Sequence, residues 1–274
     1  MNVPIVALLT DFGTSDPYVG VMKGVILRQC PNAQLIDLTH AVAPQHVRQA
    51  SYLLGTAFSH FPPHTVFLAV VDPGVGTSRR AVAIRTDHGC FVGPDNGLFT
   101  DVLRATQIIE AVALTTPPDA SQTFHGRDVF APAAAALANG TALSSLGTPI
   151  NAVQRLDHIS PAITESSLRG EIIHIDHFGN LITGIGPCHW SPDSHLIIAV
   201  DDYGVLTLDP SVCQVRLANH VIDQFHPTYG FSIAGSALAL ISSDGQLEIA
   251  VNGGSAAQYL DAHLGDSVEL RYHR

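Results

Sequence analysis

The residue pattern changes near residue 160, and this change constrains the fold more than any other feature of the chain. Before it, short runs rich in β-branched residues alternate with stretches of helical spacing, which favours a mostly parallel sheet flanked by helices. After it, short β-rich runs follow one another closely between turn formers, which favours a small antiparallel sheet or barrel. We therefore predict an α/β protein with an N-terminal α/β domain over 1–160, a polar linker over 161–170 and a smaller C-terminal β domain over 171–274.

The predicted elements of the first domain are strands and helices in alternation. The strands lack strict polar alternation, as expected for strands covered on both faces, and they span Pro4–Leu9, Thr65–Val71, Ala81–Thr86 and Cys90–Val92. The helices span Tyr18–Cys30, Val47–Phe58, Leu98–Ala105 and Val129–Asn139. We expect Asp128 to be the N-cap of the last helix and Gly140 to end it. The strands predicted in the second domain span Glu171–Ile175, Leu181–Ile185, His195–Val200, Val205–Leu208, Val215–Leu217, Ala237–Ile241, Leu247–Val251 and Ser267–Tyr272.

Composition excludes several classes of partner. The 274 residues include 24 acidic and 13 basic ones, and the basic residues are scattered, so no basic stripe suits a nucleic-acid backbone. No apolar run is long enough to span a bilayer, and Met1–Leu9 is interpreted as a first strand, not a signal peptide. The four cysteines lie far apart without metal-ligand spacing, which indicates reduced thiols and makes the cytoplasm the default location.

Polar and glycine residues gather after the first predicted strand, in the segment Thr10–Asp16. Loops at the carboxyl ends of strands in an open α/β sheet are where ligands bind. A cap and turn for the following helix explain part of this segment. Two carboxylates, Asp11 and Asp16, exceed what one cap needs, and such groups can accept hydrogen bonds from ribose hydroxyls or a ligand ammonium. Both interpretations stay open on the residues alone.

Two further loops of the first domain have the same ambiguity. Asp72-Pro73-Gly74 is a turn signature, but Arg79 and Arg80 follow it at a spacing that allows an ion pair or an anion site. Phe124–Asp128 leads into the alanine-rich helix, where a histidine, His125, can belong to an anion or water site. A lone histidine is more often structural than catalytic.

The second domain has three polar loops that are candidates for ligand contact. Asp176–Asn180 lies between two predicted strands, and a hairpin explains its Gly and Asn but not the Asp and His at its entry. The segments Ser242–Gly245 and Asn252–Ser255 could expose backbone groups to a planar heterocycle. On composition alone they are better interpreted as turns.

Six motifs in this order resemble one family, the S-adenosyl-L-methionine (SAM) hydroxide adenosyltransferases, or adenosine-forming SAM hydrolases, relatives of the SAM-dependent fluorinase and chlorinase. The resemblance runs nearly from end to end of the chain. The motifs are Leu9–Gly13, Val71–Thr77, Gly93–Gly97, Phe124–Asp128 with Phe130-Ala131-Pro132, Asp176–Asn180 and Leu247–Ala250.

The resemblance implies that water attacks the 5′ carbon of the ribose of SAM and releases adenosine and L-methionine. It implies no cofactor and no metal, and a homotrimer in which each site lies between the first domain of one subunit and the second domain of a neighbour. The leaving group is a neutral thioether, so no general acid is required. Bulk water, with a pKa of about 15.7, is a poor nucleophile, and a base within reach contributes roughly 100- to 10,000-fold.

The resemblance also implies a role for individual residues. It assigns the hydrolytic groups to Asp72, Arg79 and His125, and the ribose contact to Asp11. It places the methionine end of the substrate near Asp16, Asp176 and Ser243. It assigns the adenine contacts to Asn180 and to the backbone from Val251 to Gly253.

Alternatives to hydrolysis are halide transfer, which gives a 5′-halo-adenosine, and non-catalytic binding of adenosine or SAM; a metallohydrolase is the last alternative. Halogenases of the family have Tyr at the position of Asp72, and fluorinases have Ser at the position of Gly126. Hydrolysis is therefore favoured. The chain departs from the fluorinase pattern at Asp244, where that enzyme has Arg, and at Tyr18, where it has Ser. Gly184 occupies a position that is often Asn. These departures concern mainly the residues expected to bind the methionine end of the substrate.

Overall fold

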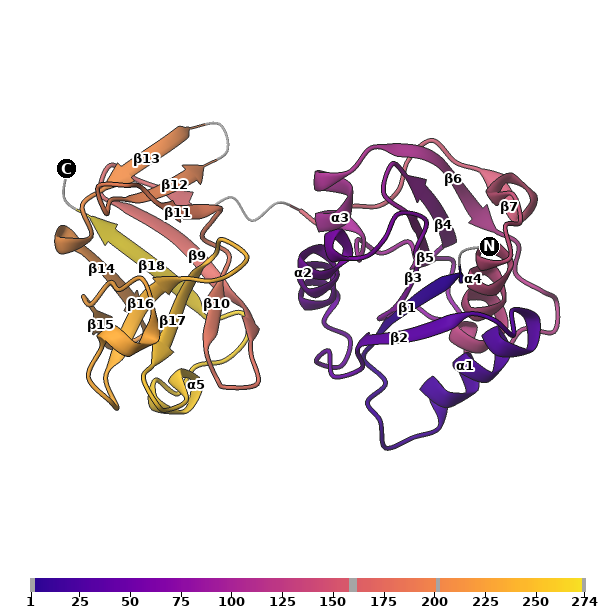
Figure 1. Cartoon of the computed structure of the whole chain (residues 1–274), viewed down its shortest axis with the longest axis horizontal. Coiled ribbons are helices and arrows are strands. Elements are labelled where there is room, and N and C mark those ends of the chain that lie inside the picture. The colour runs from indigo at the N-terminus through magenta and orange to yellow at the C-terminus, as the bar shows by residue number, and fades with distance from the viewer. Residues whose placement is uncertain (1–2, 158–161, 201–202, 273–274) are drawn as a thin grey trace. The chain divides into compact units, whose positions relative to one another are not determined.

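The computed structural model describes residues 3–157, 162–200 and 203–272 of the chain (Figure 1). The chain divides into two compact units, Met1–Asp157 and His158–Arg274. Each unit has its own hydrophobic core, as expected for a chain of this length.

Unit 1 contains a seven-stranded sheet with the order β2-β1-β3-β5-β4-β6-β7. The pairs β1–β2, β1–β3 and β3–β5 are parallel, whereas β4 pairs antiparallel with β5 and β6, and β6 with β7. The predicted α/β class is confirmed, and the sheet is mixed, with its parallel strands on one side. The strands span Ile5–Thr10 (β1), Gln34–Thr39 (β2), Val66–Val70 (β3), Ala81–Thr86 (β4), Cys90–Pro94 (β5), Ile108–Leu114 (β6) and Gly147–Pro149 (β7).

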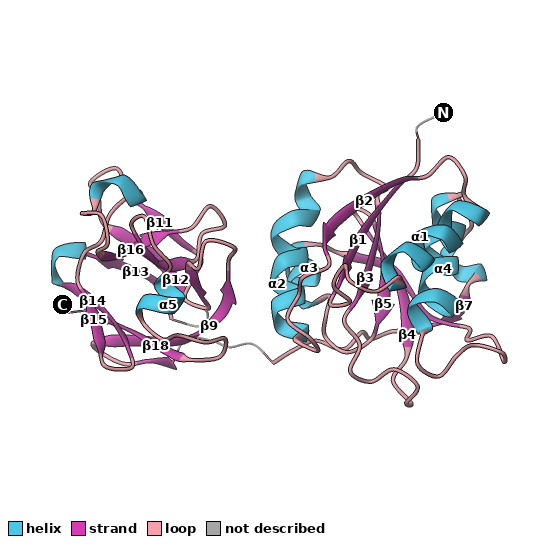
Figure 2. Cartoon of the chain, turned by 90° about the horizontal axis from the view of Figure 1, so that it is seen from below, coloured by secondary structure: helices cyan, strands magenta, loops and turns pink. Residues whose placement is uncertain are grey.

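Helices cover both faces of this sheet (Figure 2). On one face, α1 (Tyr18–Gln29) and α4 (Ala131–Ala138) enclose a core that includes Leu8; on the other, α2 (Val47–Ala57) and α3 (Thr100–Ala105) enclose a core that includes Leu9. Successive strand residues point to opposite faces, so both must be apolar. This explains why the strand sequences lack polar alternation. Among the described residues, no helix is long and apolar enough to span a membrane.

The start of the alanine-rich helix differs from the prediction. A π-helical turn, Gly126–Phe130, precedes α4 and has no side-chain cap. Asp128 lies inside this turn, where its carboxylate accepts hydrogen bonds from Arg127 Nε (2.6 Å) and Ser121 N (2.9 Å). The expectation that Asp128 is the N-cap is therefore wrong, because its side chain is already held by these partners.

Unit 2 is an antiparallel β structure, as predicted. Its main sheet has the order β15-β14-β18-β9-β10-β17-β16, and contacts between β15 and β16 nearly close it into a barrel around a core that includes Tyr272. Strands β11-β12-β13 form a separate sheet. The bounds are Ala162–Ile163 (β8), Ser167–Ile175 (β9), Leu181–Thr183 (β10), Cys188–Trp190 (β11), Leu196–Val200 (β12), Gly204–Leu208 (β13), Cys213–Leu217 (β14), His220–Ile222 (β15), Ala237–Ile241 (β16), Leu247–Val251 (β17) and Ser267–Tyr272 (β18), with the short helix α5 at Ala256–Tyr259.

The segment predicted as a polar linker, 161–170, is not a linker over its described part. Its residues form β8 and the first part of β9, which pairs with β18 from Ser167↔Arg271 to Glu171↔Ser267. Leu168 is fully buried there. Leu168 and Ile172 are buried, whereas Arg169 is exposed and Glu171 partly exposed, so these charged residues lie on the face of the strand away from the core. Pro161 lies outside the described residues.

Gly93 of β5 allows two strands to approach closely. A Cβ atom at this position would lie 2.1 Å from the carbonyl oxygen of Ala69 and 3.0 Å from the ring of Phe99. We expect Gly93→Ala to lower the free energy of unfolding by about 3 kcal/mol, because neither neighbour can yield without disturbing the core. Thermal unfolding measures this loss.

Gly20→Ala is the matched control. This glycine lies within α1, and an added Cβ meets nothing within 4 Å. Since alanine favours a helix by roughly 1 kcal/mol over glycine, the control leaves the melting temperature unchanged or raises it. An unchanged melting temperature for Gly93→Ala contradicts the close approach described here.

Candidate functional site

Several candidate residues lie at the carboxyl edge of the parallel strands of unit 1. Asp11 directly follows β1, and Asp72 comes two residues after β3. Arg79 precedes β4, whose first residue Ala81 pairs with Pro94, the last residue of β5. Because β5 runs parallel to β3, this pairing brings Arg79 to the same edge. This is the edge at which α/β sheets bind ligands.

Asp72, Arg79 and His125 form one hydrogen-bonded group. Arg79 donates from Nε to Asp72 Oδ1 over 2.9 Å, and from Nη2 to Asp72 Oδ2. Nη2 also lies 2.9 Å from His125 Nδ1. The side chains of Arg79 and Asp72 are 10% and 5% exposed, and the guanidinium lies 5.1 Å from the ring centroid of Phe130. A bidentate pair of this kind fixes the carboxylate and guanidinium in one plane.

The contact with Arg79 determines which nitrogen of His125 carries the proton. A guanidinium only donates hydrogen bonds, so Nδ1 must be the acceptor, and the neutral ring carries its hydrogen on Nε2. Burial, followed by the charge of Arg79, lowers the pKa of His125 below its ordinary value of 6.5, which favours the neutral ring. His125 Nε2 is buried and has no hydrogen-bond partner in the described part of the chain.

The loop after β1 holds its two carboxylates differently. Asp11 is half-buried, and its Oδ2 accepts a hydrogen bond from Gln45 N over 2.8 Å. Asp16 is exposed. Neither carboxylate caps the following helix, since α1 has Pro17 at its N-cap position and no side-chain cap bond. The structural interpretation of these acidic residues as helix caps is therefore wrong.

Three aromatic rings lie beside this loop. Phe12, Tyr18 and Phe124 contact one another edge to face, with ring centroids 5.3 to 6.1 Å apart. Phe12 follows Asp11 in the chain and Phe124 precedes His125, so the rings form an apolar wall next to the candidate groups. Packing of this kind stabilises the loops that carry the polar residues.

In unit 2, Asp176 and Asn180 meet in the turn between β9 and β10. The carboxylate of Asp176 accepts hydrogen bonds from Phe178 N (2.9 Å), Asn180 N (2.8 Å) and Asn180 Nδ2 (3.0 Å). Asn180 is buried, whereas the Phe178 side chain is exposed. The carboxylate thus closes the turn and sets the direction of the amide of Asn180.

The other predicted residues of unit 2 lie at the two ends of β17. A Cβ at Gly179 would lie 2.0 Å from Ser255 Oγ, so the turn after β9 packs against the segment that follows β17. Val251 and Gly253 belong to this end of the sheet. Ser243 is exposed in the hairpin before β17, so the length of that strand separates it from Val251. The structure brings Asp176, Asn180, Val251 and Gly253 together, and not Ser243.

Glu248, which is not among the predicted site residues, is a buried carboxylate in β17. It is 3% exposed, and Tyr229 donates a hydrogen bond to its Oε1 over 2.8 Å. Burial raises the pKa of Glu248, and the charges of Asp176 and Asp244 raise it further. Burial and this carboxylate also raise the pKa of Tyr229. An acidic residue inside the apolar run Leu247–Val251 is the signal that could have revealed this group.

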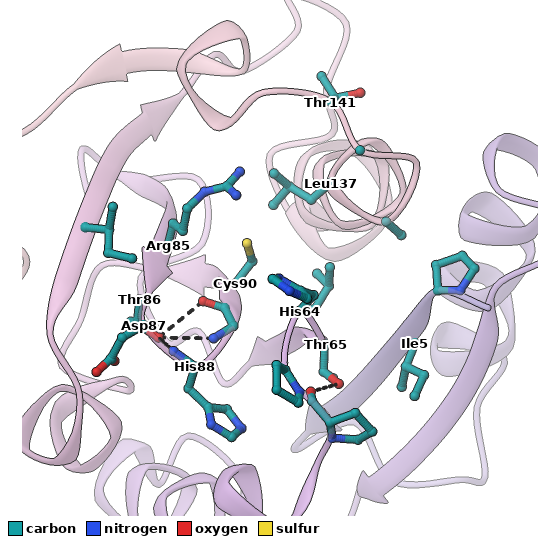
Figure 3. Close-up of a pocket in the computed structure, with 18 of the residues that line it drawn as sticks. Ile5, His64, Thr65, Arg85, Thr86, Asp87, His88, Cys90, Leu137 and Thr141 are labelled. Carbon is teal, nitrogen blue, oxygen red and sulfur yellow. Dashed lines mark hydrogen bonds between the residues drawn. The ribbon is translucent and has the colours of Figure 1, made fainter. Parts of the chain in front are cut away.

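A separate cavity of about 730 Å³ opens at the opposite edge of the sheet of unit 1, where β1 and β3 begin (Figure 3). Arg85 of β4, Cys90 of β5 and Leu137 of α4 contribute side chains to it. None of the predicted site residues lines this cavity. Among the described residues, no group of His, Cys, Asp and Glu side chains is arranged to hold a metal ion.

Comparison with known families identifies the chain. The model of the SAM hydroxide adenosyltransferase N-terminal domain matches residues 6–147, and that of the C-terminal domain matches residues 170–269. The chain belongs to the SAM hydroxide adenosyltransferase family. The two family domains fall within the two units of the structure.

Curated relatives of the chain match it over nearly its whole length. A protein of Thermus thermophilus named (R)-S-adenosyl-L-methionine hydrolase is 39% identical, covering 97% of this chain and 98% of its own. A hydrolase of the same name from Salinispora tropica is 36% identical, covering 97% of both chains. A fluorinase of Nocardia brasiliensis is 28% identical, covering 98% of this chain and 97% of its own. The chain is thus more similar to these hydrolases than to this fluorinase.

Solved structures have the same fold. A protein of Thermotoga maritima, described as an uncharacterized conserved protein, superimposes with a TM-score of 0.82 at 37% identity, covering 97% of this chain and 99% of its own. A conserved hypothetical protein of Thermus thermophilus gives a TM-score of 0.74 at 38% identity, with the same coverage.

Proposed function

We propose that this protein hydrolyses SAM to adenosine and L-methionine, with Asp72, Arg79 and His125 as its catalytic residues. The observation that carries the proposal is His125 Nε2, a buried donor without a protein partner among the described residues, beside a bidentate Asp–Arg pair. A buried polar atom of this kind needs a hydrogen-bond partner, and a water molecule that serves as the nucleophile is such a partner. Membership of the family supports the same reaction.

The geometry supports a division of roles among the three side chains. His125 donates from Nε2–H to a lone pair of the water oxygen, so it orients the nucleophile and stabilises its hydroxide character. Because Nε2 carries a hydrogen, this nitrogen does not act as a base; Asp72 accepts the proton instead. Arg79 holds both groups in place. We therefore assign the proton of the water to Asp72 and the orientation of the water to His125.

The reaction balances without a further reactant. The water oxygen forms a bond to the 5′ carbon while the bond from that carbon to the sulfonium sulfur breaks. The electron pair of the broken bond stays on sulfur, which becomes the neutral thioether of methionine. One proton of the water passes to Asp72 and then to solvent, and the other remains on the new 5′ hydroxyl of adenosine.

We propose that the substrate is the (R) epimer at the sulfonium sulfur, because the hydrolases similar to this chain are named for it. Asp11 binds the ribose hydroxyls, and Asp16, Asp176 and Ser243 hold the methionine end. Asn180 and the backbone from Val251 to Gly253 bind adenine. Ser243 and Val251 lie at opposite ends of β17, as contacts to opposite ends of an elongated substrate would, whereas Asp176 lies beside Asn180.

The assembly and the location of the protein are proposed from the family resemblance and from the state of the cysteines. We propose a homotrimer with each site between the first domain of one subunit and the second domain of a neighbour, as the family resemblance implies. The four cysteines, all within the described residues, are free and buried, which supports a reducing compartment such as the cytoplasm.

The structure favours hydrolysis over halide transfer. A halide in the place of the proposed water would lie beside the carboxylate of Asp72, and like charges repel. Gly126 offers no side-chain donor for a halide, and a Cβ there would lie 3.1 Å from Met22 Sδ and from the Phe124 ring. A larger side chain at Gly126 therefore has little room without movement of these neighbours.

Incubation of the protein with each SAM epimer tests the proposal. We expect adenosine and L-methionine in equal amounts, with faster turnover of the (R) epimer, and ¹⁸O from labelled water in the 5′ hydroxyl of adenosine. Chromatography and mass spectrometry measure the products. Added chloride or fluoride should give no new nucleoside.

Three outcomes would contradict the proposal. A 5′-halo-adenosine would indicate halide transfer, and binding of SAM in calorimetry without turnover would indicate a non-catalytic binding protein. Loss of activity on treatment with a chelator would indicate a metallohydrolase. Faster turnover of the (S) epimer would overturn the assignment of the substrate epimer alone.

A further inference from the structure

A chain of four hydrogen-bonding groups lies behind the loop that carries Asp11. His40 Nε2 lies 2.9 Å from Asp37 Oδ1, and His40 Nδ1 lies 2.8 Å from Thr10 Oγ1. Thr10 Oγ1 accepts a hydrogen bond from Phe12 N over 3.2 Å. Lys23, from α1, binds the other oxygen of Asp37 over 2.6 Å. Two of the four side chains in this network are buried: Thr10 is 0% and His40 6% exposed. Asp37 and Lys23 are not buried.

The directions of these hydrogen bonds follow from the chemistry of the groups. A carboxylate only accepts, so His40 donates from Nε2–H to Asp37, and in the neutral ring Nδ1 is then the acceptor. Thr10 therefore donates its hydroxyl hydrogen to Nδ1, and its oxygen is left to accept from Phe12 N. Each group provides the hydrogen-bond partner that the next one needs, and such a network is rigid when every member has its partners.

The order Asp37–His40–Thr10 resembles that of a hydrolytic triad, but the arrangement is not nucleophilic. Thr10 is fully buried, and its oxygen already accepts from the backbone, so no substrate atom can approach it. The network instead holds the surrounding backbone in place. It lies at the carboxyl ends of β1 and β2, next to the loop that carries Asp11.

The network and its neighbours fix both sides of Asp11. Thr10 precedes it and is held by His40, and Phe12 follows it and is held by Thr10. Gly13 N donates to His40 O over 2.8 Å, and the carboxylate of Asp11 accepts from Gln45 N over 2.8 Å. The segment from His40 to Gln45 therefore forms the frame of this loop.

We propose that His40 is a positioning residue for the reaction: with Thr10 and Asp37, it holds Asp11 where Asp11 binds the substrate ribose. This inference rests on the proposed function, which gives Asp11 its ribose contact. The contact exists in both the bound substrate and the transition state. Disruption of the network should therefore raise KM with little change in kcat.

Two substitutions at His40 separate the contacts of its two nitrogens. His40→Asn keeps an amide oxygen near the position of Nδ1, so it can still accept the hydrogen bond from Thr10. The longer side chain of His40→Gln reaches toward Asp37 instead and loses the hydrogen bond to Thr10. We expect Thr10→Val and His40→Gln each to raise KM about tenfold, as expected for the loss of one buried hydrogen bond. His40→Asn should raise KM much less, and Thr10→Ser should restore it.

His88→Gln is the matched control. This ring also makes a hydrogen bond, from Nε2 to Phe58 O over 2.9 Å, but it lines the cavity at the opposite edge of the sheet. It should lower the melting temperature without changing KM. Steady-state kinetics with SAM, affinity for adenosine by calorimetry, and thermal unfolding are measured for every variant.

The outcomes separate this inference from the proposed function. If the parent protein does not hydrolyse SAM, the proposed function is wrong, and adenosine affinity in the variants still tests the network. The inference is overturned if Thr10→Val and His40→Gln leave KM and adenosine affinity unchanged. It is also overturned if they lower only kcat and stability, because a purely structural role predicts that result.

Discussion

Asp72→Asn is expected to lower kcat for SAM hydrolysis by roughly 1,000-fold, within the range of 100- to 10,000-fold that a general base contributes. The amide cannot accept the proton that the attacking water releases. It also keeps an oxygen that can still accept one hydrogen bond from Arg79, so the loop keeps most of its shape. Single-turnover kinetics under saturating SAM measure the chemical step directly.

The substitution also affects stability, and this effect needs its own control. Arg79 is only 10% exposed, and removal of the charge of its partner costs up to about 3 kcal/mol. Asp95→Asn makes the same change at a second Asp–Arg pair of unit 1, in which the carboxylate is 3% exposed and its partner Arg80 is 45% exposed. The carboxylate of Asp95 accepts hydrogen bonds from Arg80 Nε over 2.8 Å and Gln154 N over 2.7 Å. We expect Asp95→Asn to lower the melting temperature with kcat close to that of the parent protein.

Comparison of the two variants identifies the role of Asp72. If kcat falls in both variants in proportion to stability, Asp72 is a structural residue and the proposed proton acceptor is wrong. If Asp72→Asn keeps its melting temperature and its kcat, the carboxylate takes no part in the reaction. Only a loss of kcat at Asp72 that exceeds its loss of stability supports the proposed role.

The fold of this chain could be predicted where each segment carries its own signal. The predicted helices agree with α1 to α4 within a few residues, because apolar spacing is a local feature. Strand β2 was missed because it lies at the edge of the sheet, and Gln34 and Asp37 interrupt its apolar run. The prediction for strand β9 is too short because its first half, residues 167–171, has Leu168 as its single large apolar residue, which a polar linker could also have.

The candidate site could be predicted only in part, for a different reason. Asp72 and Arg79 belong to one motif, and their spacing allowed an ion pair, which the structure contains. The contact between Arg79 and His125 joins residues 46 positions apart, and that between Thr10 and His40 joins residues 30 apart. No local pattern announces such pairs. The tautomer of His125 and the frame of the Asp11 loop therefore emerged only from the structure.

The tautomer of His125 leads to the second large effect. If Nε2–H is a donor to the water, a side chain that donates from the same place should replace it in part. We expect His125→Ala to lower kcat about 100- to 1,000-fold, as the loss of a donor to a developing oxyanion does. His125→Gln has an amide nitrogen that can reach the position of Nε2, and its kcat should fall less, by about tenfold. An amide cannot accept the proton, so a general-base role of His125 predicts an equal loss in both variants.

The pH dependence of kcat tests the same assignment independently. Burial and Arg79 lower the pKa of His125, so the neutral, active ring persists below pH 6.5, and activity is lost as the pH falls through the lowered pKa. Protonation places a hydrogen on Nδ1, which then faces the hydrogen of Arg79 Nη2 and breaks the contact. The same sign holds for stability: the contribution of the neutral ring is complete above about pH 6.5 and is lost as the pH falls through the lowered pKa.

His125→Gln should therefore lose the acid limb that this histidine causes, because its amide does not titrate. The control is the parent protein, measured over the same pH range with thermal unfolding at each point, so that acid unfolding is separated from loss of turnover. An acid limb that persists unchanged in His125→Gln assigns the titration to another group. An equal loss of kcat in the glutamine and alanine variants contradicts the donor role, and returns the imidazole to the role of proton acceptor.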